Sequence, residues 1–330
     1  MLVKKAISYY LDNYISLSQR DISTSGKSRE WFLKRVENVI NSRSGEPKLY
    51  SGTHGDKFIY FGSFFKGTKV ADVDEYDVLV LIDSNSGYFS RSEQRIGTGQ
   101  GIANPNPKYY RKYYKEDNSG ISPAKMLNWL KSIVDEVVET YDGEAPIRDG
   151  QAITATIKSE DFKIDLVPAG VFLNAQGVVF YNIPDGSISN SWITTSPKLD
   201  IEMLNKLADG RDDFKNVIRI LKRIKDTYNF QISSFPIEMS AVHYVYANDW
   251  RQDLYIDTTG LIRSLSISFR NGNIPDKYND DQNLLDGIEN LDWYADRLDN
   301  IAESLDSFHD RLTDEDDVKN RVVSLFENES

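Results

Sequence analysis

The feature that most constrains this chain is an apolar run with acids crowded in front of it, DEYDVLVLID, at residues 74–83. The run VLVLI that ends at Ile82 predicts a strand buried inside a sheet. Asp74, Glu75 and Asp77 stand at its start. Carboxylates there must be solvated, paired or bound to a metal, because an isolated buried charge is too costly. The chain is therefore expected to build a sheet with acids at the start of a buried strand.

The remaining pattern predicts an α+β protein, with helix and sheet mixed in the first half and mostly helix in the second. Apolar spacing predicts a helix at about 28–43, and Ser122-Pro123 is typical of the start of another. We expect strands at KFIYFG, AITATIK, FKIDLVPAGVFL and GVVFYN, and later helices at about 198–208, 212–228, 236–247, 282–307 and 315–327. The 330 residues suffice for two lobes, placed at 1–195 and 196–330.

Composition narrows the class of protein. The chain has no cysteine, which excludes disulfides, zinc ribbons and thiol nucleophiles and fits a reducing compartment. No stretch approaches the roughly 18 consecutive apolar residues of a membrane span, and the start does not resemble a signal peptide. We therefore expect a cytoplasmic protein with no membrane partner. The formal net charge of -12 indicates a surface that repels nucleic acid unless a basic patch is segregated.

The stretch 84–120 is rich in Gly, Asn, Ser and Pro and then turns aromatic and basic. It predicts a long loop, or a loop followed by an edge strand. Its run PKYYRKYYK, at 107–115, is the one strongly basic aromatic segment. The run is compatible with a nucleic-acid or nucleotide contact, but we favour an edge strand protected by Lys and Arg.

Two patterns beside the acidic strand suggest chemistry. Glycine at Gly62 lets the backbone approach a ligand, and the Ser63 hydroxyl beside exposed N–H groups can hold phosphate oxygens, although Gly-Ser is also a common turn. Strand alternation places Glu75 and Asp77 on one face, where they repel unless a hard cation such as Mg²⁺ lies between them. Taken alone, a Glu-x-Asp pair favours a solvated acidic strand start over a metal site.

A third acid, Asp165, lies between Ile164 and Leu166 in a distant apolar strand. It is either a functional group or a satisfied structural polar residue. If its strand neighbours the first, Asp165 completes a triad able to hold two Mg²⁺ (or Mn²⁺) ions, one beneath a triphosphate and one activating a hydroxyl for in-line attack. Asp165 can also accept the proton of that hydroxyl.

With Gly-Ser, Gly-Thr, Glu-x-Asp and a distant strand Asp, the chain resembles the polymerase β-type nucleotidyltransferase superfamily. The form GSFFKGTKV…DEYDV resembles its cyclic GMP-AMP synthase-like (CD-NTase) branch, and the likeness continues to about residue 247. The resemblance implies a polymerase β-type core with a mixed sheet and a C-terminal helical lobe that closes over the nucleotide site. It also implies template-independent synthesis of a cyclic di- or trinucleotide from ATP, GTP or other ribonucleoside triphosphates. A separate effector protein would read the product, in bacterial antiphage signalling.

The resemblance further assigns roles to residues. The triad would be catalytic and metal-binding, and the other assigned residues would contact nucleotide: Gly62 and Ser63 the donor triphosphate, Lys222 and Ser234 its phosphates, Phe235 the donor base by stacking, and Thr195 and Ser196 the acceptor base. Lys222 is also compatible with a solvated helix residue, and Phe235 with ordinary core.

The chain also departs from the family. Without cysteine and with three histidines it cannot build the zinc-bearing thumb by which vertebrate cyclic GMP-AMP synthase grips DNA, and we expect no nucleic-acid activator. Ile193 stands where some members use an arginine for guanine, so the choice of base stays open. Two alternatives remain: a nucleotidyltransferase acting on a macromolecular acceptor (tRNA or protein), and a catalytically inactive nucleotide sensor.

Overall fold

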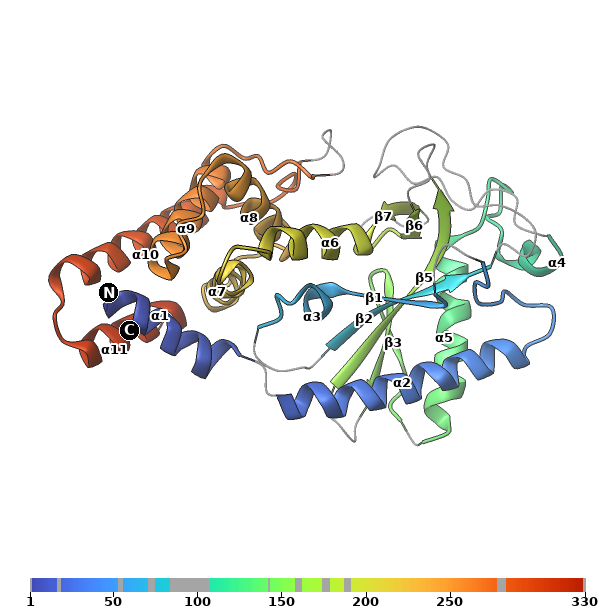
Figure 1. Cartoon of the computed structure of the whole chain (residues 1–330). Helices are drawn as coiled ribbons and strands as arrows, with labels where there is room; N and C mark the ends of the chain where they lie inside the picture. Colours follow the sequence, from blue (N-terminus) through green and yellow to red (C-terminus); the bar gives the residue numbers. More distant parts are fainter. Residues whose placement is uncertain are drawn as a thin grey trace. The chain divides into compact units, whose positions relative to one another are not determined.

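The chain divides into two compact units (Figure 1). The sheet unit comprises residues 18–65 and 73–201, and the helical unit comprises 1–17, 66–72 and 202–330. The backbone last crosses from the sheet unit to the helical unit between residues 201 and 202. The sequence suggested a boundary between residues 195 and 196. The computed structural model describes residues 2–16, 19–52, 56–70, 75–83, 107–141, 143–157, 162–173, 179–186, 191–277 and 283–328.

A seven-stranded mixed sheet forms the centre of the sheet unit. Its strands are β1 (Phe58–Phe61), β2 (Glu75–Ile82), β3 (Ile147–Asp149), β4 (Ala152–Ile157), β5 (Phe162–Leu173), β6 (Val179–Pro184) and β7 (Trp192–Thr195). The order is β1-β2-β5-β4-β3, with β6 paired to β5 and β7 paired to β6. Strands β2 and β5 run parallel, and every other pair is antiparallel. The predicted α+β fold with a mixed sheet is confirmed.

Two long helices, α2 (Gln19–Ser42) and α5 (Pro123–Glu139), belong to the same unit (Figure 1). Helix α5 begins as the sequence predicts: the Ser122 hydroxyl accepts a hydrogen bond from the Lys125 backbone N–H, and Pro123 occupies the first turn. Its apolar face packs against β4 and β5. This packing supports one face of the sheet.

The opposite face of the sheet carries a second apolar layer. Its members are Ile59, Leu79, Leu81, Ala152, Val167, Ala169, Val171, Tyr181 and Ile183. They alternate along their strands with residues of the first face, as strand geometry requires. Because Leu79 follows Asp77 by two residues, this layer continues the face on which Asp77 lies.

The helical unit surrounds its own core. Its helices are α1 (Leu2–Tyr10), α7 (Phe214–Thr227), α8 (Phe235–Ala247), α9 (Leu254–Arg270), α10 (Leu291–Arg311) and α11 (Glu315–Glu327), and α6 (Pro197–Ala208) begins in the sheet unit and ends here. Helix α1 packs against α11 and α9, and α9 packs against α10. Of these helices the sequence predicted α6, α7, α8 and α11 closely, began α10 too early and missed α1 and α9.

The preference for an edge strand at 107–115 is wrong. The segment forms a short helix, α4 (Pro107–Tyr110), and a 3₁₀ turn (Arg111–Tyr113). The physical reason is the spacing of Tyr110 and Tyr113, since residues three apart share a helical face and both rings are buried. The Tyr110 hydroxyl donates to the Asp83 carbonyl. Residues 84–106 of the loop predicted over 84–120 lie outside the described residues.

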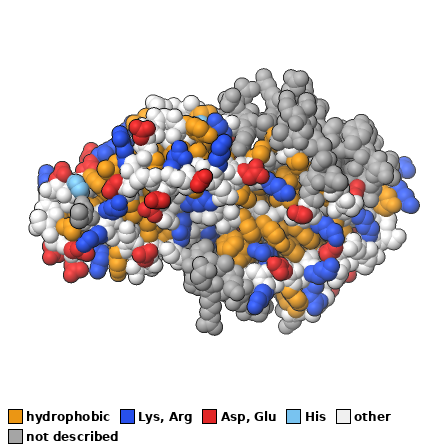
Figure 2. All heavy atoms as spheres, viewed as in Figure 1, with side chains coloured by type: hydrophobic (Ala, Val, Ile, Leu, Met, Phe, Trp, Pro, Cys, Tyr) orange, Lys and Arg blue, Asp and Glu red, His pale blue; other side chains and the backbone are white. Residues whose placement is uncertain are grey.

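The described part of the chain contains no helix both long and apolar enough to cross a bilayer. On the face shown in Figure 2, Lys and Arg side chains lie among Asp and Glu side chains, around a central area of hydrophobic side chains. The sequence-based expectation of no nucleic-acid activator stays a prediction.

Candidate active site

Three carboxylates converge where β2 and β5 run side by side. In the parallel register Asp77 lies directly opposite Asp165, and Glu75 precedes Asp77 by two residues on the same strand face. One carboxylate oxygen from each of the three residues lies within 4.8 Å of the others, and all three residues are partly exposed. The acids predicted to meet therefore do meet. Asp74, which the sequence also brought to attention, lies outside the described residues.

The donor set suits a hard divalent cation. Carboxylate oxygens are the ligands that Mg²⁺ and Mn²⁺ prefer, and three like charges this close repel one another unless a cation or protons compensate them. Partial exposure leaves room for the waters or substrate oxygens that Mg²⁺ usually keeps. A cation bound here would supply Lewis-acid activation of a hydroxyl and of phosphate oxygens.

Gly62 brings backbone against the Asp77 carboxylate. Its φ of +77° lies in the region that favours glycine, and a Cβ at this position would lie 1.7 Å from Asp77 Oδ2. Ser63 follows in α3 (Gly62–Lys66), the short helix between β1 and the segment that leads to β2. The Gly-Ser turn is therefore placed beside the acidic cluster, as its proposed phosphate contact requires.

A polar residue that the sequence did not single out supports Asp165. The Thr154 hydroxyl on β4 donates to Asp165 Oδ1 at 2.6 Å, and Thr154 is 7% exposed. The available signal was a threonine in the apolar segment AITATIK, which becomes informative only once β4 is known to pair with β5.

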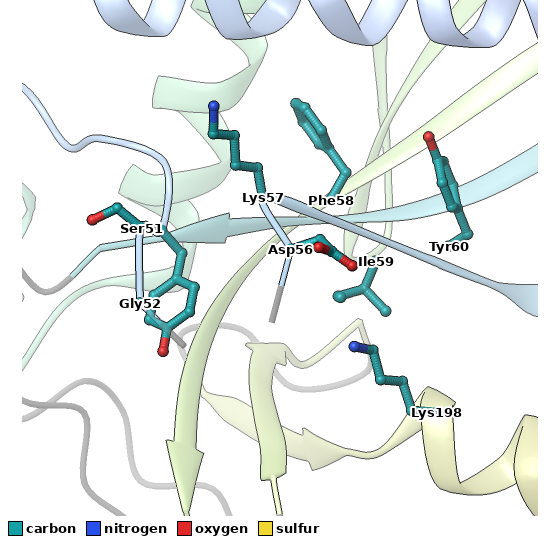
Figure 3. Close-up of a pocket in the computed structure, with 9 residues that line it drawn as sticks. Ser51, Gly52, Asp56, Lys57, Phe58, Ile59, Tyr60 and Lys198 are labelled. Atoms are coloured by element: carbon teal, nitrogen blue, oxygen red, sulfur yellow. The ribbon is translucent and has the colours of Figure 1, made fainter. Parts of the chain in front are cut away.

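An open pocket of about 680 Å³ lies beside β1 (Figure 3). Tyr50, Asp56, Ile59 and Lys198 are among its lining residues, and the Lys198 side chain extends toward Ile59 in Figure 3. Ile59 pairs with Leu79, two residues beyond Asp77, so the pocket begins about 7 Å along the strand from that acid. It opens on the triad's face of the sheet, and no pattern in the sequence predicted it.

Thr195 and Ser196, the two residues predicted to contact the acceptor base, lie in different surroundings. Thr195 pairs with Tyr181, and the strand registers place it on the same sheet face as the triad. Ser196 is 7% exposed and its hydroxyl donates to the Val179 carbonyl at 3.3 Å. Of the two predicted acceptor contacts, Thr195 is the better placed, and both remain proposals.

Lys222, in the helical unit, is buried rather than solvated. It is 3% exposed, and its ammonium donates to Glu238 Oε1 at 2.5 Å and to Thr68 Oγ1 at 2.8 Å. Lys66 donates to the other oxygen of Glu238 at 2.7 Å, and Thr68 donates to Oε1 at 2.9 Å. We call these four residues the Glu238 network. Reading Lys222 as a solvated helix residue is therefore wrong.

The network keeps Glu238 ionised. Burial on its own raises the pKa of a carboxyl, but the charges of Lys66 and Lys222 outweigh burial and hold the pKa of Glu238 below its ordinary value. Glu238 is 2% exposed, so its charge depends on these partners.

Ser234 and Phe235 mark the start of α8. Ser234 occupies the N-cap position without a side-chain capping bond, and Phe235 is half-buried at the rim of the helical core. The Lys66 ammonium lies 5.0 Å from the centre of the Phe235 ring, within cation–π range. Phosphate binding by Ser234 and base stacking by Phe235 remain proposals.

A mixed sheet with three convergent carboxylates and a Gly-Ser turn defines a nucleotidyltransferase of the polymerase β type. Comparison with known proteins agrees, since residues 64–175 match the Mab-21 protein nucleotidyltransferase domain. A protein of Bacillus cereus (strain VD146) named "Probable cyclic nucleotide synthase" is 28% identical over 86% of this chain and 85% of its own length. A "Cyclic GMP-AMP synthase-like receptor" of Tribolium castaneum is 21% identical over 73% of each chain.

Solved structures agree on the fold. E. coli MS115-1 CdnC with ATP superposes with a TM-score of 0.70 at 13% identity, covering 98% of this chain and 97% of that one. CdnC in its complex with HORMA-deltaN gives a TM-score of 0.68 at 14% identity, with 99% and 97% covered. The matched domain and the relatives support a place for this chain in the cyclic GMP-AMP synthase-like (CD-NTase) family, and the chain is a nucleotidyltransferase.

Proposed function

We propose that the chain joins ribonucleoside triphosphates, without a template, into a cyclic di- or trinucleotide. The observation that carries the proposal is the convergence of Glu75, Asp77 and Asp165 beside the Gly62-Ser63 turn. The name of the Bacillus cereus relative supports the same product class.

In this proposal Glu75, Asp77 and Asp165 hold two Mg²⁺ or Mn²⁺ ions. The three carboxylates would thereby position the donor triphosphate and the attacking hydroxyl for reaction. Ser63 binds the donor triphosphate, and Asp165 accepts the proton of the attacking ribose hydroxyl. The hydroxyl oxygen bonds to the donor α-phosphorus as the bond to the leaving pyrophosphate breaks, and a repeat of this step closes the ring. Catalysis then rests mainly on positioning and electrostatics, because phosphoryl-type transfer asks little covalent chemistry of the protein.

The pocket beside β1 supports a second nucleotide on the triad's side of the sheet. A ribose hydroxyl at the triad leaves its base several ångströms away, comparable with the distance of about 7 Å along the strand from Asp77 to the pocket. Tyr50 and Ile59 offer apolar surface to a base, and Lys198 offers a charge to its phosphates. We therefore propose that the acceptor base binds in this pocket. A contact between that base and Thr195 remains a separate proposal.

We also propose nucleotide contacts for three residues of the helical unit. Ser234 would hydrogen-bond a donor phosphate and Phe235 would stack on the donor base. Lys222 would reach phosphate only by sharing its ammonium with Glu238 and Thr68. The product would act on a separate effector protein in the cytoplasm, in antiphage signalling.

The test is a reaction of the purified chain with labelled ATP, GTP, CTP and UTP and Mg²⁺ or Mn²⁺. We expect a phosphatase-resistant product whose mass identifies a cyclic di- or trinucleotide, and we expect Asp77→Asn to abolish it. A product that is only linear would show that ring closure is wrong. Label transferred to RNA or protein would instead identify a macromolecular acceptor, and absence of any metal-dependent turnover would indicate a sensor.

A further inference from the structure

The three acids of the triad are not held alike. Asp77 and Asp165 face each other across a parallel strand pair, and each meets a different neighbour on its outer side. Backbone at Gly62 closes against Asp77, leaving no room there for a side chain. Thr154 supports Asp165 from β4 with a hydrogen bond of 2.6 Å.

The direction of that hydrogen bond follows from chemistry. An ionised carboxylate only accepts hydrogen bonds, so the Thr154 hydroxyl must be the donor. Hydrogen bonds from a hydroxyl to a charged acceptor are short and about twice as strong as neutral ones, which agrees with 2.6 Å. The bond occupies Oδ1 of Asp165 and thereby fixes the plane of the carboxylate.

Strand geometry makes Thr154 a stiff support. Thr154 lies directly opposite Asp165 in the antiparallel β4–β5 register, where facing side chains come closest. A β-branched residue has few χ1 rotamers, and Thr154 is 7% exposed, so burial restricts it further. The hydroxyl therefore holds one position without help from a ligand.

Without the hydrogen bond from Thr154, repulsion between carboxylates favours rotation of the Asp165 side chain away from the other two acids. Its carboxylate lies among two others whose oxygens come within 4.8 Å, and like charges at this distance repel. Rotation about χ1 or χ2 relieves the repulsion and carries the carboxylate out of the shared position. The Thr154 bond opposes that rotation before any cation is present.

We propose that Thr154 is a positioning residue that holds Asp165 in the orientation needed to share a divalent cation with Glu75 and Asp77. The inference rests on the proposed function in taking the triad as the metal site. Thr154 acts through Asp165 and touches neither cation nor substrate.

The experiment compares Thr154→Val with Thr156→Val in the full chain. Valine keeps the shape and strand preference of threonine and removes the hydroxyl. Thr156 is the matched control because it lies on the same strand and face, opposite Lys163 rather than an acid. Mn²⁺ binding without nucleotide is measured by electron paramagnetic resonance, and the Mg²⁺ concentration for half-maximal activity is measured separately.

We expect Thr154→Val to weaken Mn²⁺ binding by about 10- to 100-fold, the usual effect of removing a partner of a metal ligand. The half-activating Mg²⁺ concentration should rise in parallel, Thr156→Val should match the wild type, and Thr154→Ser should recover most of the affinity. Circular dichroism verifies folding, and Thr154→Ala replaces the valine variant if that variant unfolds. Equal Mn²⁺ affinity in Thr154→Val and the wild type would overturn the inference, as would saturable Mn²⁺ binding that survives Asp77→Asn.

The two proposals fail in different ways. A wild type that binds Mn²⁺ at the triad, loses affinity on Thr154→Val, but makes no cyclic product would refute the function and keep the role of Thr154. A cyclic product with Mn²⁺ affinity unchanged by Thr154→Val would keep the function and refute the positioning role. A wild type without saturable Mn²⁺ binding would overturn the positioning role outright.

Discussion

Replacing Glu238 by alanine removes a carboxylate that accepts from two buried lysines and a threonine. Lys222 is 3% exposed and Lys66 is 9% exposed, so neither ammonium is well hydrated once the carboxylate is gone. Removing one partner of a buried ion pair destabilises proteins by about 3–5 kcal/mol, mostly through the charge left behind. We expect Glu238→Ala to lower the free energy of unfolding of the helical unit by this amount.

The assay is urea unfolding of the full chain, followed by far-ultraviolet circular dichroism and tryptophan fluorescence. Trp250 and Trp293 report on the helical unit, and Glu303→Ala, at an exposed position of α10, is the matched control with an expected change within about 0.5 kcal/mol. The double variant Glu238→Ala/Lys222→Met should lose less stability than the sum of the two single variants. A loss below about 1 kcal/mol for Glu238→Ala, or strict additivity, would refute the reasoning.

The Glu238 network also predicts that the free energy of unfolding falls at acid pH. The pKa of Glu238 is lower folded than unfolded, so its contribution to stability is present above the ordinary glutamate pKa of about 4.3 and is lost as the pH falls through the lower folded value. Urea midpoints measured from pH 7 down to pH 3 should fall less steeply for Glu238→Gln than for the wild type. Parallel curves would show that Glu238 is not the group responsible.

Three further outcomes are expected. Gly62→Ala should leave thermal unfolding within a few degrees of the wild type but abolish Mg²⁺-dependent turnover, because its Cβ would collide with the Asp77 carboxylate; retained turnover would contradict this. Glu327→Gln should destabilise the chain by about 1.5–3 kcal/mol in urea unfolding, because Arg223 loses a charged partner at 3.0 Å, and an unchanged midpoint would count against it. Lys198→Ala should raise KM for the acceptor nucleotide more than it lowers kcat, and a pure kcat effect would argue against a binding role for the pocket.

Much of the sheet unit follows from local sequence. The buried strand after Asp77 and the helix that begins at Ser122-Pro123 show period and capping signals that need no tertiary information. Asp165 was recognisable as an acid out of place, but its meeting with Asp77 depends on parallel pairing of strands 88 positions apart (165 − 77), which no local rule supplies. The family resemblance supplied that link.

Other features depend on tertiary contacts, which the spacing of apolar residues in the sequence does not predict. Helix α9 was missed, although its Asp253 cap is a standard start signal and its buried face includes Leu261 and Leu265. The burial of Lys222 was unforeseeable, because Lys222, its partner Glu238 and the pair Lys66 and Thr68 come from three separate segments. Thr154 escaped notice for the same reason.

The route of the backbone has a practical consequence. It passes from one unit to the other at 17/18, 65/66, 72/73 and 201/202, so both units are assembled from separated stretches of sequence. A cut at any single position therefore leaves at least one of the units incomplete. Every C-terminal fragment that begins after residue 72 lacks the seven residues 66–72 of the helical unit. Expressing either unit of this enzyme alone thus requires a rejoined or permuted chain. For the helical unit, a linker would have to reconnect the segment 66–72, which carries Thr68.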